Sequence, residues 1–307
     1  MTVAAGESPK RLDQYLVLHE RDLTRARAQR LIRYGRVRVN GQPAKPSHRI
    51  QGGDRITVET PPPTDLSVGS SAASLDIVYE DATVIVVNKP AGVPMHPGAG
   101  HWTGTVYNGL LAHWGKGSGN TRHPAKPFLV HRLDKETSGL VVIAKDRQAA
   151  AHLSEQFHQH RTQRTYLALV DGSPQPAIGT IQLALGRDVR DKKRVSGKSE
   201  VLQSARTDYR VVQTLAKASL IELTPRSGRT HQLRVHLQAI GHAILGDPLY
   251  LPSPTVSNLP SPGRLMLHAL ALGFADPATD QWRSFSVPLS TDMQRYMEII
   301  NDRAFPT

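Results

Sequence analysis

A polar segment that could carry out chemistry stands directly before a strongly apolar run. Residues 131–138 contain a histidine, an arginine, a lysine, two carboxylates and two hydroxyl groups, whereas residues 140–144 are apolar and rich in β-branched side chains. Such a run is typical of a strand buried on both faces. A carboxylate at the entry to that strand is held rigidly, and Arg132 and Lys135 would help to keep it ionised. Asp134 is therefore a candidate catalytic residue, although a surface turn ahead of a core strand explains this segment equally well.

A second segment, residues 224–237, brings three arginines to the point where a strand is expected to turn into a helix. The amides at a helix N-terminus can face an anion, so this segment suits an anionic substrate. Arg234 falls on the inner part of the expected helix, where an unpaired guanidinium would be costly and a buried carboxylate is its natural partner. Asp134 is the candidate for that partner, and an ordinary surface arginine is the alternative.

Several common catalytic sets are absent from the sequence. The chain has no cysteine, no phosphate-binding loop ending in Gly-Lys-Ser/Thr, no dinucleotide-binding fingerprint and no Gly-x-Ser-x-Gly elbow. His152, His158 and His160 form the tightest group of histidines, but their spacing does not bring all three to one face of a helix. No cluster of carboxylates suggests a two-metal nuclease. We therefore expect neither a metal site nor a cofactor.

The charge of the chain favours a polyanionic partner. The 307 residues carry a formal net charge of +12, and residues 1–60 alone hold twelve Lys and Arg against six Asp and Glu. RNA, DNA or an acidic membrane would attract such a protein. No apolar run approaches the roughly 20 residues that span a bilayer, and the first ten residues lack the apolar core of a signal peptide. We expect a cytoplasmic protein that does not bind membranes.

The N-terminal part, residues 10–60, has the pattern of a small α/β module. Its second expected helix carries Arg27, Arg30 and Arg33 apart from the apolar face, which suits contacts to RNA phosphates, although an Arg-rich face can simply be solvated. Residues 61–74 are rich in Pro, Gly and Ser and are expected to be a linker. The expected elements of the module are helices at 11–18 and 25–34, strands at 37–39 and 54–59, and a tight Asn-Gly turn at 40–41.

Residues 75–303 are expected to form one catalytic domain of the α+β class. The expected strands outnumber the expected helices and rarely alternate with them, which favours a mixed, largely antiparallel sheet flanked by helices and loops over a doubly wound fold. The basic stretch 187–198 is expected to be a loop or the tip of a hairpin. The expected strands are 76–79, 83–88, 140–144, 165–171, 180–185, 205–213, 219–224 and 268–274, and the expected helices are 105–114, 146–161, 230–240 and 291–301.

Motifs in the N-terminal module resemble a known RNA-binding domain. They are Arg11-Leu-Asp-Gln-Tyr-Leu16, Val37-Arg-Val-Asn-Gly41 and Gly52-Gly-Asp-Arg-Ile-Thr-Val58. The domain that they resemble is the α-L RNA-binding domain, named after the fourth small-subunit ribosomal protein.

Motifs in the remainder resemble those of the RluA-type pseudouridine synthases. His131-Arg-Leu-Asp134 followed by Thr137-Ser-Gly-Leu140 is similar to the active-site signature of that family. Other motifs of the family are matched by Asn88-Lys-Pro-Ala-Gly92, by Tyr166 within Thr165-Tyr-Leu-Ala-Leu-Val170, and by Gly228-Arg-Thr-His-Gln-Leu-Arg-Val-His236. The order of these motifs behind an α-L domain is most similar to the subgroup that modifies large-subunit ribosomal RNA.

The resemblance implies an isomerase that converts uridine in RNA to pseudouridine and needs no metal or cofactor. It makes Asp134 the essential carboxylate, which either attacks the sugar or removes its 2′ proton, and it makes Arg234 the residue that holds Asp134 in place. Tyr166 would pack on the uracil and assist the final removal of a proton from carbon. Arg132 would fill the gap that the flipped base leaves in the RNA.

The identity of the RNA stays open at this level. Large-subunit (23S) ribosomal RNA or its assembly precursor is the expected partner, and transfer RNA is the alternative. Two readings belong to other functional classes: a non-catalytic ribosome-assembly factor that only binds RNA, and a hydrolytic nuclease. We expect the protein to act as a monomer.

Overall fold

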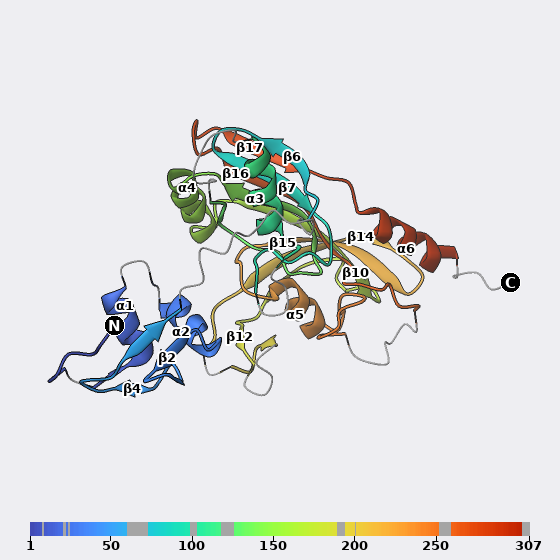
Figure 1. Ribbon diagram of the computed structural model, residues 1–307. Helices are drawn as coiled ribbons and strands as arrows, with labels where there is room; N and C mark the ends of the chain where they lie inside the picture. Colours follow the sequence, from blue (N-terminus) through green and yellow to red (C-terminus); the bar gives the residue numbers. More distant parts are fainter. Residues whose placement is uncertain are drawn as a thin grey trace. The chain divides into compact units, whose positions relative to one another are not determined.

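The chain forms two compact units, Met1–Ser67 and Val68–Thr307. The computed structural model describes residues 1–7, 9–20, 23, 25–59, 73–98, 103–117, 126–188, 194–199, 201–251 and 259–302, which are drawn in colour in Figure 1. Within these ranges, the side chains of Ala26, Arg27, Arg30, Lys116 and Asp302 are not described. Most of the predicted linker, residues 61–74, lies outside the described ranges, so the domain boundaries expected from the sequence stay predictions.

The first unit packs two helices against small sheets. Its core is made by Leu12 and Leu16 from the first helix, Ala28 and Ile32 from the second, and Ile56 from the last strand. Strands β3, β2 and β5 form a three-stranded sheet in that order, and β1 pairs with β4. The elements are β1 (Lys10–Arg11), α1 (Leu12–His19), α2 (Arg25–Arg33), β2 (Val37–Val39), β3 (Gln42–Pro43), β4 (Arg49–Ile50) and β5 (Ile56–Val58).

A buried carboxylate joins the two helices of this unit. The Asp13 side chain on α1 is fully buried and accepts hydrogen bonds from Arg11, from Arg25 and from Gln29, the last at 2.6 Å. The hydrogen bond from Arg11 is the largest cause of a lowered pKa of Asp13, so the carboxylate stays charged. The predicted tight turn is present after β2, where Asn40 and Gly41 have φ values of 52° and 79°.

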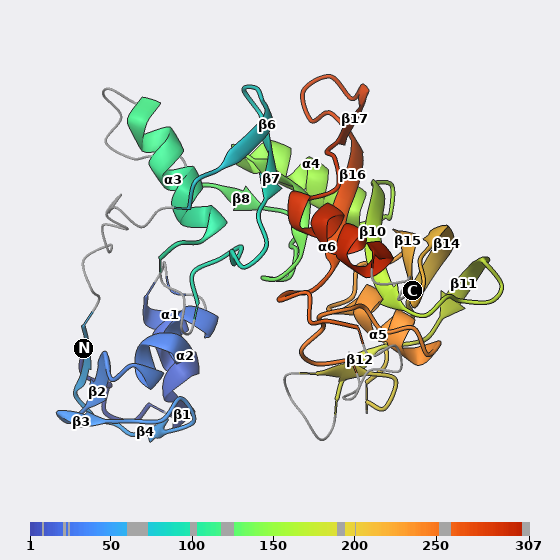
Figure 2. The same cartoon turned by 90° about the vertical axis from the view of Figure 1, so that its right-hand side faces the viewer.

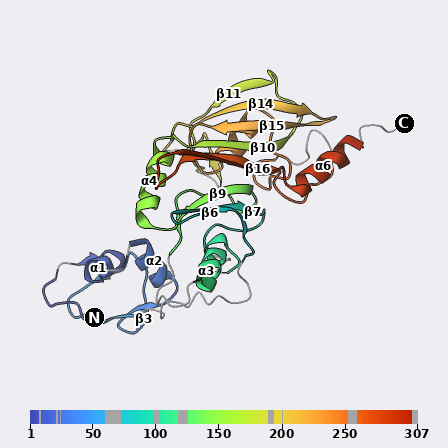
Figure 3. The same ribbon diagram turned by 90° about the horizontal axis from the view of Figure 1, so that it is seen from above.

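The second unit is built on one large sheet, seen from above in Figure 3. In the described part of the chain the sheet has ten strands, with β11-β14-β15-β10-β16-β9-β7-β6 as its main order, β17 beside β16 and β8 beside β9. The pairing of β16 with β9 is parallel and the other pairings are antiparallel. The prediction of an α+β domain with a mixed, largely antiparallel sheet is therefore confirmed.

The strands of the sheet lie close to their predicted positions, with short additions. They are β6 (Asp76–Glu80), β7 (Val84–Lys89), β8 (Phe128–Leu129), β9 (Ser138–Ala144), β10 (Gln163–Asp171), β11 (Ile178–Gln182), β14 (Arg206–Thr214), β15 (Ala218–Pro225), β16 (Leu267–Ala275) and β17 (Trp282–Ser286). Strand β17 was not predicted: its sequence, Trp-Arg-Ser-Phe-Ser, has no apolar run, and it is a strand because it pairs with β16 (Figure 2). Outside the sheet, β12 (Gly186–Arg187) and β13 (Val195–Ser196) form a small hairpin in the predicted basic stretch 187–198; residues 189–193 lie outside the described part.

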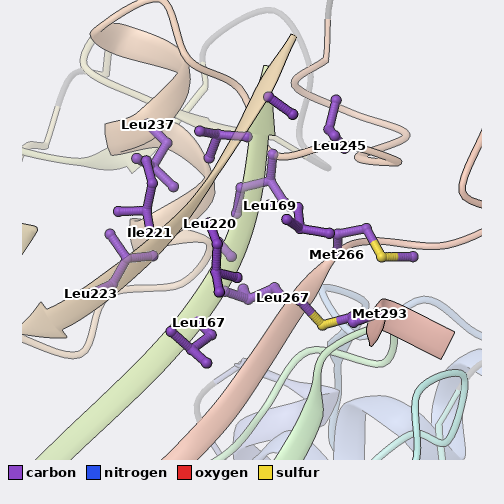
Figure 4. Packing of buried hydrophobic residues seen from close by; sticks show 14 of the residues in the cluster. Leu167, Leu169, Leu220, Ile221, Leu223, Leu237, Leu245, Met266, Leu267 and Met293 are labelled. Atoms are coloured by element: carbon purple, nitrogen blue, oxygen red, sulfur yellow. The ribbon is translucent and has the colours of Figure 1, made fainter. Parts of the chain in front are cut away.

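Four helices accompany the sheet in the described part of this unit: α3 (Val106–Gly117), α4 (Arg147–His158), α5 (Gln232–Ala239) and α6 (Thr291–Asp302). The largest core cluster joins β10, β15 and β16 to α5 and α6 (Figure 4). Leu237 on α5 and Leu169 on β10 are both fully buried in it. Truncation of such a leucine to alanine costs about 2–5 kcal/mol, so this packing fixes α5 firmly on the sheet.

Candidate active site

The loop that carries Asp134 ends where two paired strands, β9 and β16, approach each other closely. Strand β9 begins beside β16, with Ser138 opposite His268 and Gly139 opposite Ala269. Gly139 has φ +106°, and a Cβ on it would lie 2.2 Å from the carbonyl oxygen of Ala269. Only glycine fits this position, because any side chain would collide with the backbone of β16, and a residue other than glycine would be strained at this positive φ. The bend at Gly139 fixes where the loop 130–137 leaves the sheet.

A buried lysine contacts the backbone of the same loop. Lys89, at the end of β7, is fully buried, and its ammonium group donates hydrogen bonds to the carbonyl oxygens of Pro90, Val93 and Lys135 at 2.8, 2.9 and 2.9 Å. Burial lowers the pKa of Lys89 to about 7, while the three acceptors favour its protonated form. The segment Asn88–Gly92 therefore supports the loop 130–137, which the sequence alone did not reveal.

We expect Lys89→Met to destabilise the protein by about 2–4 kcal/mol, because it removes the buried ammonium donor from the carbonyl oxygens of Pro90, Val93 and Lys135, of which, in the described part of the chain, Lys135 alone keeps a second donor, the Gly92 amide. Urea denaturation would measure the change. Lys135→Met is the matched control, since the Lys135 side chain is 43% exposed and its loss should change the free energy of unfolding by at most about 0.5 kcal/mol. Equal urea midpoints for the two variants would show that Lys89 does not brace the loop.

His131 is a packing residue of this loop. Its Nε2 accepts a hydrogen bond from the backbone amide of Val142 at 3.0 Å, and its ring stacks on Phe157 with 4.4 Å between the centroids. Burial lowers the pKa of His131 to about 3. The imidazole is therefore neutral at ordinary pH and holds the loop against β9 and α4.

Asp134 and Arg234, one hundred residues apart in sequence, form an ion pair. The Nη1 atom of Arg234 donates to Oδ2 of Asp134 at 3.1 Å. Arg234 lies on α5, and its side chain is 6% exposed, compared with 21% for Asp134. A guanidinium this deeply buried needs a carboxylate, which is the reason the sequence pointed to this pair.

The structure adds a second carboxylate that the sequence analysis missed. Asp247 is fully buried and binds Arg234 through both oxygens, at 2.7 Å from Nε and 2.8 Å from Nη2. Its Oδ1 also accepts hydrogen bonds from the backbone amides of Leu249 and Tyr250. Burial would lower the pKa of Arg234, but the hydrogen bonds and charges of Asp247 and Asp134 outweigh burial and raise it. Arg234 is therefore a permanent cation held at a fixed angle.

His231 is the third group beside the Asp134 carboxylate. Its Nε2 lies 3.7 Å from Oδ2 of Asp134, and its Nδ1 lies 2.9 Å from the hydroxyl of Tyr250. Burial lowers the pKa of His231 more than the charge of Asp134 raises it, so neutral imidazole is favoured. The residue precedes α5 in a left-handed conformation with φ 56°. The Tyr250 ring in turn lies 5.0 Å from the guanidinium of Arg234.

Asp134, His231 and Arg234 line one cleft of about 660 Å³. The cleft is lined by all four catalytic-domain residues singled out from the sequence, Arg132, Asp134, Tyr166 and Arg234. The Arg132 side chain is exposed, and Tyr166 on β10 is half-buried. Burial raises the pKa of Tyr166, so its hydroxyl is protonated near neutral pH. The cleft thus presents a fixed carboxylate, an aromatic ring and an exposed cation to any molecule that enters it.

The predicted RNA-binding arginines lie on α2 of the first unit. Arg33 is exposed and donates to Gln29 at 3.3 Å. Arg27 and Arg30 belong to the same helix, but their side chains lie outside the described residues. Their contact with RNA stays a prediction.

The histidines that drew attention in the sequence do not gather around a metal position. His152 lies 3.4 Å from Asp280 and hydrogen-bonds to Gln156. Among the residues that the structure describes, no group of three or more His, Asp or Glu could hold a metal ion. The described helices are all too short or too polar to cross a bilayer.

Comparison with known proteins identifies both units. Residues 83–239 match the family model described as RNA pseudouridylate synthase, and residues 10–56 match that of the S4 domain. An uncharacterized RNA pseudouridine synthase of Bacillus subtilis, YlyB, is 38% identical over 302 residues, covering 97% of this chain and 96% of that protein. The ribosomal large subunit pseudouridine synthase D of Neisseria meningitidis serogroup A is 37% identical, covering 98% and 81%.

A solved structure agrees with the sequence relatives. The human RNA pseudouridylate synthase domain containing 1 superposes with a TM-score of 0.58 at 28% identity, covering 70% of this chain and 83% of that one. The resemblance carried by the motifs is thereby confirmed at the level of the family. The chain belongs to the RNA pseudouridylate synthases, isomerases that convert uridine to pseudouridine in RNA, and it carries an N-terminal S4 RNA-binding domain.

Proposed function

We propose that the protein modifies uridines of large-subunit ribosomal RNA, acting as a monomer with Asp134 as its essential carboxylate. The observation that carries this proposal is the Asp134–Arg234 ion pair at 3.1 Å inside a cleft that Tyr166 and Arg132 also line. The choice of RNA is supported by the relative named ribosomal large subunit pseudouridine synthase D, which is similar over nearly the whole chain. The net charge of +12 suits any polyanionic substrate and does not choose among RNAs.

The reaction exchanges one bond to the ribose for another. The bond between N1 of uracil and C1′ breaks, a bond between C5 and C1′ forms, C5 loses a proton and N1 gains one. Oδ2 of Asp134 is engaged by Arg234, and no partner for Oδ1 is found among the described residues. Oδ1 would therefore face the sugar, where it either attacks C1′ or removes the 2′ proton.

The two hydrogen bonds from Arg234 to Asp247 would keep Asp134 in one position, both while the N1–C1′ bond breaks and while the C5–C1′ bond forms. Arg234 cannot turn, because Asp247 holds it at two points. The hydrogen bond from this cation keeps the Asp134 carboxyl group at one angle while the uracil detaches, turns and rejoins. No step requires the carboxylate to move away from Arg234.

The other two cleft residues would handle the base. A uridine within a helix cannot reach Asp134, so it must be flipped out of the stack. Tyr166 presents its ring as a surface for the uracil, and its protonated hydroxyl could relay the proton that leaves C5. The exposed Arg132, two residues before Asp134, would occupy the vacated place in the RNA, since a planar guanidinium can stack on bases and bind phosphate.

A map of pseudouridine in total RNA from cells with and without the gene would test the substrate. We expect one or more sites in 23S ribosomal RNA to disappear and to return when the gene is restored. Loss of sites in transfer RNA alone would make transfer RNA the substrate. If every site remained, the protein would instead be an RNA-binding factor without this activity.

We also expect RNA binding to weaken steeply with salt while the chemical step barely changes. Contacts between Lys or Arg and phosphates release counterions, so several such contacts lower affinity by about 10-fold or more between 50 and 200 mM salt. Dissociation constants and single-turnover rates at saturating RNA, measured over that range, would separate the two effects. A dissociation constant that is independent of salt would contradict binding through phosphates.

A further inference from the structure

A group of basic side chains, two arginines and two histidines, lines the cleft away from the Asp134–Arg234 pair and has no role in the steps above. It comprises Arg164 on β10, the exposed Arg229 before α5, and the exposed His158 and His160 at and after the end of α4. Among the described residues that line the cleft, Asp134 is the sole carboxylate, and Arg234 already engages it. This part of the cleft is therefore cationic and has no acidic residue of its own.

Arg164 is the best positioned member of this cluster. Its Nη2 has a long contact of 3.4 Å to the carbonyl oxygen of Ser227, and its guanidinium lies 5.8 Å from the centre of the Phe157 ring. Its Nε is buried and has no hydrogen-bond partner. No carboxylate pairs with Arg164 in the described part of the chain. A partly buried cation left without an anion is costly, which suggests that its partner is a ligand.

The position of Arg164 relates it to the reacting nucleotide. Arg164 and Tyr166 are two residues apart on β10, on either side of an irregularity in its pairing with β16, and both line the cleft. Gly228 leaves room beside the guanidinium: a Cβ there would lie 3.2 Å from Nη1 of Arg164. A base lying on Tyr166 would therefore have its backbone near Arg164.

We infer that Arg164 binds a phosphate group adjacent to the flipped uridine and so positions that nucleotide over Asp134. A guanidinium with free N–H donors binds phosphate through charge-assisted hydrogen bonds, and phosphate is the anion that an RNA substrate supplies. Nearby Arg229 adds positive potential to the same region. The inference rests on the proposed chemistry at Asp134, but it does not depend on which RNA is modified.

The test combines a change in the protein with a change in the RNA. The substrate is a synthetic RNA stem–loop that contains a uridine modified by the wild-type enzyme, with a neutral methylphosphonate in place of either the 5′ or the 3′ phosphate of that uridine. Arg164→Met removes the charge but keeps an unbranched chain against Phe157, and Arg164→Lys restores a charge. Arg161→Met is the control, because Arg161 is an exposed arginine three residues away that does not line the cleft.

We expect one of the two methylphosphonates to lower kcat/KM of the wild-type enzyme by about 10-fold or more, as loss of a hydrogen bond to a charged group does. Arg164→Met should lower kcat/KM on unmodified RNA by a similar factor. For this variant, the methylphosphonate should lower kcat/KM by less than about a further 3-fold, because the partner of the phosphate is already missing. Arg164→Lys should fall between Arg164→Met and the wild type. Arg161→Met should have the wild-type kcat/KM on unmodified RNA, and the methylphosphonate should lower that value as much as it does for the wild type.

A purely structural role for Arg164 gives a different pattern. In that case the penalties of Arg164→Met and of the methylphosphonate would multiply, and the inference would be wrong. If Arg164→Met does not fold, the same comparison is made with Arg164→Lys, whose altered geometry should reduce the methylphosphonate penalty. If mapping places the target uridine in transfer RNA, the large-subunit proposal fails, while this comparison proceeds on a transfer-RNA stem–loop.

Discussion

Asp134→Asn is expected to abolish pseudouridine formation, lowering the single-turnover rate by about 10³-fold or more, while RNA binding and the fold persist. Asparagine keeps the oxygen that accepts the hydrogen bond from Arg234 at 3.1 Å, so the side chain stays in place. It loses the negative charge, and with it the ability to attack C1′ or to remove the 2′ proton. Release of tritium from C5-labelled uridine in RNA would measure the rate.

Glu136→Gln is the matched control for Asp134→Asn. Glu136 lies in the same loop, its side chain is 38% exposed, and it does not line the cleft. Its neutralisation should leave the rate within about 2-fold of wild type, because surface substitutions away from the site rarely alter function. Turnover by Asp134→Asn near the wild-type rate would assign the chemistry to another residue.

Asp247→Ala is expected to produce the largest loss of stability, about 3–5 kcal/mol, and to slow the reaction as well. The substitution leaves the buried Arg234 with a single carboxylate and removes the acceptor for the amides of Leu249 and Tyr250. Arg234 would then be free to turn, so Asp134 would lose its fixed angle. We expect kcat of the folded fraction to fall by about 10-fold or more, measured beside thermal unfolding.

A second buried carboxylate separates the effect of Asp247 on stability from its effect on catalysis. Asp276 is also fully buried, pairs with Arg283 and accepts hydrogen bonds from the amides of Ala278 and Thr279, away from the cleft. Asp276→Ala should therefore destabilise the protein comparably while kcat of the folded fraction remains unchanged. If both variants reduced kcat equally, the loss of activity would reflect general instability rather than a role for Asp247 in positioning Arg234.

Much of the site could be predicted because some of its residues stand where their type is unusual, such as a charged side chain on the buried face of a helix. Arg234 falls on the apolar side of a helix, and such a residue requires an anion, which made Asp134 its natural partner. Tyr166 entered only through resemblance, since a tyrosine at the start of an apolar strand is equally typical of a core. The strands were predictable from runs such as Leu140–Ala144, which is wholly buried as β9.

The supporting residues could not be predicted because nothing local marks them. Asp247 follows a glycine and precedes a proline, a context that is typical of a surface turn. Lys89 has the type of side chain that is usually exposed, yet its ammonium group is buried by carbonyls from two separate segments. Burial of both residues depends on contacts between distant parts of the chain. Only the tertiary structure supplies that information.

The parallel contact between β9 and β16 is two residues long, Ser138–Gly139 against His268–Ala269, and it joins the two halves of the sheet. Asp134 belongs to the half with β6, β7 and β9, whereas Arg234 and Asp247 belong to the half with β10, β14 and β15. Asp134 and the arginine that holds it therefore lie on opposite sides of this short contact. Bending along this contact would change the distance between Asp134 and Arg234, so we expect a substitution that loosens the contact to lower activity before it unfolds the protein.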